Sequence, residues 1–72
     1  MLHLAQQTIR DWQAADEIAS SAERRLKDAW AAFAANRRPP PSKELMDEVS
    51  NARSLANSLL NEAMRLMAEA AL

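Results

Sequence analysis

The side chains of this sequence that could carry out chemistry are few and scattered. His3 is the only histidine, and the chain contains neither cysteine nor glycine, so thiol chemistry and glycine-rich phosphate loops are excluded. Asp16 and Glu23 are seven residues apart, a spacing that places both carboxylates on one face of a helix. Such a pair acts as general acid and base only beside a pocket and a reacting group. We therefore expect no enzyme, and no catalytic, cofactor-binding or metal-binding residues.

The composition predicts an all-α protein of one small domain, residues 1–72. Alanine is the commonest residue, followed by other good helix formers, whereas valine and threonine occur once each and tyrosine never. A sheet needs more β-branched and aromatic residues than this chain has. The first ten residues lack the basic and apolar segments of a signal peptide, so we expect a cytoplasmic protein without membrane contact.

Two heptad patterns predict an antiparallel helical hairpin, with helices over about 4–35 and 43–71 joined by a proline-rich turn over 36–42. The segment from Asn36 to Glu44, which contains this turn and the start of the second helix, reads NRRPPPSKE. Its prolines cannot continue a helix, Asn36 suits the left-handed conformation that closes one, and Ser42 is a natural N-cap. We interpret the segment as a brace between helices; recognition of its prolines by another protein is an alternative.

The apolar stripes of the two helices are expected to pack together along one seam. If the chain reverses at residues 39 and 40, large residues of one helix meet small residues of the other, a pattern typical of closely packed helices. The predicted seam consists of Trp12, Ala15, Ala19, Ala22, Leu26, Phe33, Leu45, Val49, Ala52, Ala56, Leu59, Ala63 and Leu66.

Arg53 offers the two carboxylates a structural partner. It interrupts an apolar row of the second helix and, in the hairpin alignment, lies near residue 25. We therefore predict an ion pair between Glu23 and Arg53, which could also fix the register of a larger assembly.

A single hairpin of this composition leaves much apolar surface uncovered, which predicts a homodimer with the architecture of a four-helix coiled-coil bundle. The residues assigned to a dimer or partner interface are Ile9, Trp12, Trp30, Met46, Leu55, Leu60, Met64 and Met67. A different, unidentified protein partner is the alternative occupant of this surface. The sequence leaves open whether the two hairpins lie parallel or antiparallel.

The function expected from this shape is non-catalytic and acts through self-association and protein–protein contact, as in an adaptor, inhibitor or regulator. The alternative is a dimeric nucleic-acid-binding regulator that uses a basic cluster. Its candidate residues are Arg24, Arg25, Lys27, Arg37 and Arg38. Nucleic acid is the less expected partner, because the whole chain has a formal charge of −1 and no aromatic residues interleave the cluster.

Overall fold

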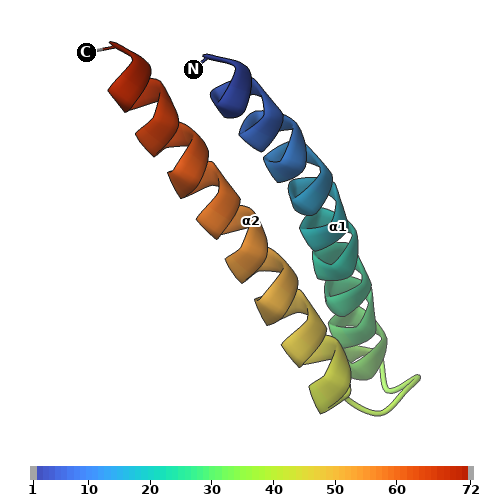
Figure 1. The fold of residues 1–72 in the computed structure, drawn as a ribbon. Helices are drawn as coiled ribbons and strands as arrows, with labels where there is room; N and C mark the ends of the chain where they lie inside the picture. Colours follow the sequence, from blue (N-terminus) through green and yellow to red (C-terminus); the bar gives the residue numbers. More distant parts are fainter. Residues whose placement is uncertain (1, 72) are drawn as a thin grey trace.

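The computed structural model describes residues 2–71, which form two antiparallel α-helices (Figure 1). Helix α1 runs over Leu2–Ala34 and helix α2 over Lys43–Ala71, which confirms the all-α hairpin. The first helix begins two residues earlier and ends one residue earlier than predicted. The hairpin measures 55 × 15 × 14 Å, so it is a rod only two helices across. Neither helix in the described part of the chain is both long and apolar enough to cross a membrane.

Asn36 closes α1 in the way that the sequence predicts. Its φ angle is 58°, in the left-handed region that glycine usually occupies at this position. The amide of Asn36 donates to the carbonyl of Phe33 at 2.9 Å, and the amide of Arg37 donates to the carbonyl of Ala32 at 3.0 Å. These two bonds form a Schellman motif, which satisfies carbonyls that the end of a helix leaves without partners.

Ser42 caps the start of α2, also as predicted. Its hydroxyl oxygen accepts a hydrogen bond from the amide of Leu45 at 3.1 Å. Glu44 lies in the first turn, where a negative charge interacts favourably with the helix dipole. The turn segment therefore contains a stop signal, three prolines and a start signal, which supports its interpretation as a brace.

The chain reverses earlier than the predicted position at residues 39 and 40. Arg25 pairs with Glu48, which places the reversal near Asn36 and Arg37. Arg38 already lies beside the last turns of α1, where it lines a hollow with residues of that helix. The reason is the cap itself, because the left-handed residue turns the chain before the prolines begin. As a result, residue 53 lies level with residue 20 instead of residue 25.

The centre of the seam consists of alanine. Within residues 3–71, all the buried positions are alanines: Ala5, Ala15, Ala19, Ala22, Ala56 and Ala63. Ala15, Ala19 and Ala56 form one cluster, against which Trp12, Ala52 and Leu59 pack while remaining partly exposed. Methyl groups at the contact allow helix axes to approach closely, but each one buries little apolar area.

Candidate functional site

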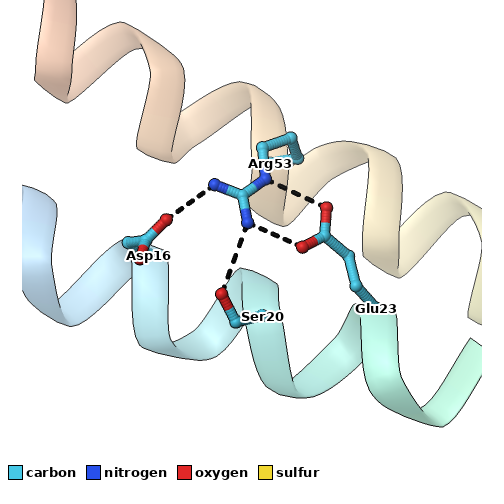
Figure 2. Close-up of polar contacts among 4 residues, drawn as sticks. All are labelled: Asp16, Ser20, Glu23 and Arg53. Atoms are coloured by element: carbon cyan, nitrogen blue, oxygen red, sulfur yellow. Dashed lines mark hydrogen bonds and ion pairs between the residues drawn. The ribbon is translucent and has the colours of Figure 1, made fainter.

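Arg53 joins the two helices through the most extensive side-chain network among the described residues (Figure 2). Its Nε donates to Glu23 Oε2 at 3.0 Å and its Nη2 donates to Glu23 Oε1 at 2.7 Å. Its Nη1 donates to Asp16 Oδ1 at 2.7 Å, and a longer bond of 3.5 Å joins Nη2 to the Ser20 hydroxyl. The structure thus brings together Glu23 and Arg53 and adds Asp16 and Ser20, one helical turn apart on α1.

The network stabilises the ionised forms of Arg53 and Glu23. The hydrogen bonds that Arg53 donates to Glu23 lower the pKa of that carboxyl, and the bonds that it donates to Glu23 and Asp16 raise the pKa of Arg53. The Arg53 side chain is 31% exposed, so the pairs are partly shielded from water. Both oxygens of Glu23 already accept from the guanidinium, which leaves this carboxylate poorly placed to act as a general base. The arrangement suits a structural clasp between helices.

A second ion pair lies on the opposite side of the seam. Arg25 donates to both carboxylate oxygens of Glu48, at 2.7 and 3.3 Å. These bonds lower the pKa of Glu48 and raise that of Arg25. Arg25 and Glu48 follow different heptad rows from Glu23 and Arg53. The two cross-helix contacts therefore mark two separate flanks of the hairpin.

The flank that contains Arg25 and Glu48 is rich in carboxylates, and we call it the acidic flank. Arg65 bonds to Glu62 and Glu69 within α2, and the bonds to Glu62 lower the pKa of that carboxyl. On this side each helix contributes two heptad rows, and the four rows together have a formal charge of −4. Their charged residues are Asp11, Arg25, Asp28, Glu44, Glu48, Glu62, Arg65 and Glu69.

The flank that contains the Arg53 network has a different character, and we call it the apolar flank. Its large apolar side chains, at least partly exposed, are Ile9, Trp30, Met46, Leu60, Met64 and Met67. The charged residues of the same rows are Asp16, Glu23, Lys27, Lys43 and Arg53, with a formal charge of +1. Apolar side chains therefore lie on both sides of the Arg53 network along the rod.

The residues predicted for the seam and for the interface differ in how far they are buried, and the differences do not follow the two sets. Trp12, assigned to both sets, packs against the alanine cluster of the seam. Phe33, assigned to the seam, remains 42% exposed and makes an edge-to-face contact with Trp30 at a centroid distance of 5.9 Å. Leu55, assigned to the interface, lies seven residues from Glu48 and therefore on the acidic flank. The seam leucines, Leu26, Leu45, Leu59 and Leu66, and Val49 are partly buried.

The basic residues of the nucleic-acid alternative do not gather on one face. Successive helical residues are about 100° apart, so Arg25 points away from Arg24 and Lys27, which are neighbours on another face of α1. Arg25 is paired with Glu48. Arg25 and Arg38 line a hollow of about 300 Å³, together with Asp28, Ala29 and Ala32. A carboxylate therefore shares that hollow with the two arginines.

Metal-ligating side chains do not converge in the described part of the chain. No group of three or more histidine, aspartate or glutamate side chains is placed to hold a metal ion there. His3 is exposed near the start of α1. Within residues 2–71, the side chains best placed to act together are those of the Arg53 network and the apolar residues on either side of it.

Two features of the site were not recognised in the sequence. The acidic flank is visible there only when the two outer rows of each helix are counted together across the hairpin. Ser20 lies beside Arg53 because the chain reverses early. The local signal for this reversal is Asn36, which takes the left-handed conformation before the prolines begin.

A comparison with protein-family models, curated proteins and solved structures found no match to this chain.

Proposed function

We propose that this chain is a non-catalytic helical-hairpin protein that acts through protein–protein contact, and that it self-associates as a homodimer with four helices in one bundle. The observation that carries this proposal is the amount of surface left exposed. The hairpin exposes 5507 Å². A compact monomer of 8.0 kDa exposes about 4,500 Å².

The excess of about 1,000 Å² is comparable with the ~800 Å² that each partner buries in a standard protein–protein interface. The shape supports the same conclusion, because the radius of gyration is 16.4 Å, against about 11 Å for a compact chain of this length. Pairing two rods side by side covers the excess surface and produces a more compact particle.

The alanine seam adds a second reason for association. A fully buried leucine or tryptophan would supply far more apolar burial than a methyl group, yet the buried positions within residues 3–71 are all alanine. The larger apolar side chains remain partly exposed. A second hairpin would cover them and provide the larger core that this one lacks.

The non-catalytic part of the proposal rests on the use of the carboxylates. Glu23 and Asp16 accept hydrogen bonds from Arg53, and Glu48 accepts from Arg25. The proposal extends to a cytoplasmic location, because a chain without cysteine needs no oxidising compartment to complete its fold.

Light scattering coupled to size-exclusion chromatography, across a wide range of protein concentration, tests self-association. We expect a mass of twice 8.0 kDa, with dissociation only at high dilution. A mass of 8.0 kDa at millimolar concentration, with intact helical circular dichroism, would overturn the homodimer and direct attention to a different protein partner. A salt-sensitive mobility shift of nucleic acid that Arg24→Ala and Arg37→Ala abolish would favour the alternative function.

A further inference from the structure

We infer that the second copy docks on the apolar flank, with the dimer axis parallel to the helices, so that the turn of one hairpin lies beside the turn of the other. This inference rests on the proposed self-association and specifies which surface is used and in which orientation. It follows from three observations: the distribution of apolar side chains, the charges of the two flanks, and the position of the Arg53 network.

The two flanks differ in their apolar content. The acidic flank has three large exposed apolar residues, Leu4, Ile18 and Leu55, separated from one another by charged residues. The apolar flank has four large exposed apolar residues and two that are partly buried, Ile9 and Leu60, and the six lie in two groups. Trp30 and Met46 lie near the turn, and Ile9, Leu60, Met64 and Met67 lie near the open end. A contact through the apolar flank therefore covers more of the excess surface.

The charges exclude the acidic flank from a contact between identical copies. In a two-fold dimer the same surface patch meets itself, so a formal charge of −4 would face another −4. Like charges brought together at an interface cost free energy and suppress the wrong pairing. The apolar flank has a formal charge of +1, and the three charges nearest its centre are already joined in the Arg53 network.

The Arg53 network determines the orientation. An axis parallel to the helices stacks α1 of one copy on α2 of the other and keeps each level of the rod opposite itself. Arg53 then faces Asp16 and Glu23 of the second copy as well as those of its own chain, because it lies level with residue 20, between the two carboxylates. An axis perpendicular to the helices instead stacks α2 on α2, with Arg53 against Arg53, and α1 on α1, with carboxylates against carboxylates.

The same orientation aligns the apolar groups. Since residue 53 lies level with residue 20, Met46 lies level with the helical turn of α1 that precedes Trp30. By the same alignment, the level of Ile9 falls between the levels of Leu60 and Met67. The apolar residues of α1, Trp30 and Ile9, therefore meet the apolar residues at the same level on α2 of the second copy. Lys27 and Lys43 lie in the rows farther from the seam, where long side chains can extend to solvent.

Matched charge variants test the choice of flank. Met67→Glu and Leu55→Glu introduce the same charge into the same helix, at side chains that are 41% and 57% exposed. Sedimentation equilibrium should show that Met67→Glu raises the dimer dissociation constant at least about 100-fold, because the residue occurs twice in the interface. Leu55→Glu should change it less than about threefold. Circular dichroism verifies that each variant stays helical, and Met46→Glu provides a second test at the other end of the flank.

Cross-linking tests the orientation, because any introduced cysteine is the only one in the chain. A mixture of Ser20→Cys and Ser50→Cys proteins, treated with a short dithiol cross-linker, should give a mixed dimer. Ser20→Cys alone should give little product, since the two copies of residue 20 lie on diagonally opposite helices. Efficient cross-linking of Ser20→Cys alone would overturn the axis, because a perpendicular axis brings these residues together.

The outcomes separate this inference from the proposed function. A wild-type chain that remains monomeric overturns both. A dimer that Leu55→Glu disrupts and Met67→Glu does not would overturn the docking surface and leave self-association standing.

Discussion

Replacing Ala56 with leucine tests whether the closely packed alanine seam controls the stability of the hairpin. Ala56 has no exposed surface and clusters with Ala15 and Ala19 of the opposite helix. Leucine adds three carbon atoms where the facing residues are themselves methyl groups against the helix backbone. The substitution leaves helix propensity almost unchanged, so its effect reports on packing between helices.

The magnitude follows from the space available. Three methylene-sized groups placed in an open apolar pocket would contribute about 2.4 kcal/mol of favourable burial. The seam around Ala56 is closed, so the helices must separate or the side chain must take a strained rotamer, which typically costs about 1–3 kcal/mol. We therefore expect the free energy of unfolding to fall by about 1–3 kcal/mol. It falls further if separating the helices at residue 56 also parts the neighbouring alanine contacts of the seam.

The assay is urea unfolding followed by circular dichroism, repeated at several protein concentrations because association adds to stability. Ala68→Leu is the matched control, since residue 68 is exposed on the outer side of the same helix. We expect the control to lie within about 0.5 kcal/mol of the wild type. Equal stability of the Ala56 and Ala68 variants, with unchanged mass and denaturant dependence, would refute the closed seam.

Three further predictions concern the turn and the ion pairs. Asn36→Gly should raise the free energy of unfolding by up to about 1 kcal/mol, because glycine takes the left-handed conformation without a steric penalty, and Asn36→Ala should lower it; the reverse order in thermal unfolding would argue against the cap. Ser42→Ala should cost about 1 kcal/mol, whereas Ser42→Asp should retain most of the stability, so equal losses would contradict the N-cap. The pKa of Glu23 lies below its ordinary value of 4.5, so its contribution to stability is fully present above that pH and is lost as the pH falls through the lower folded-state value. The free energy of unfolding, measured from pH 6 to pH 2, should therefore decline less steeply in Glu23→Gln than in the wild type. Identical slopes in the two proteins would rule out this linkage.

Local signals in the sequence were sufficient to predict the helices and their ends. Asn36 and Ser42 each act on hydrogen-bonding groups a few residues away, so their roles depend little on the rest of the fold. The heptad rows likewise identify the buried alanines, because small residues that recur at alternating spacings of three and four lie on one face of a helix.

The alignment of the two helices could not be predicted as closely. It depends on where within an eight-residue connection the chain reverses, and a shift of two or three residues there moves every cross-helix pair. Arg53 still reaches Glu23 because a long side chain tolerates such a shift, whereas its contacts with Asp16 and Ser20 require the actual alignment. Leu55 was assigned to the interface as an apolar side chain without a partner in the hairpin, although its heptad row places it among acidic residues.

The position of both helix ends at one end of the rod has a mechanical consequence (Figure 1). A force applied between Leu2 and Ala71 pulls the helices apart from the open end toward the turn, so it loads one layer of contacts at a time. The Ala63 layer near this end would open before Ala56, and the Arg53 network only after both. Such a hairpin unzips in steps at low force, and the clasp at Arg53 is the point where a partly opened rod can halt and close again.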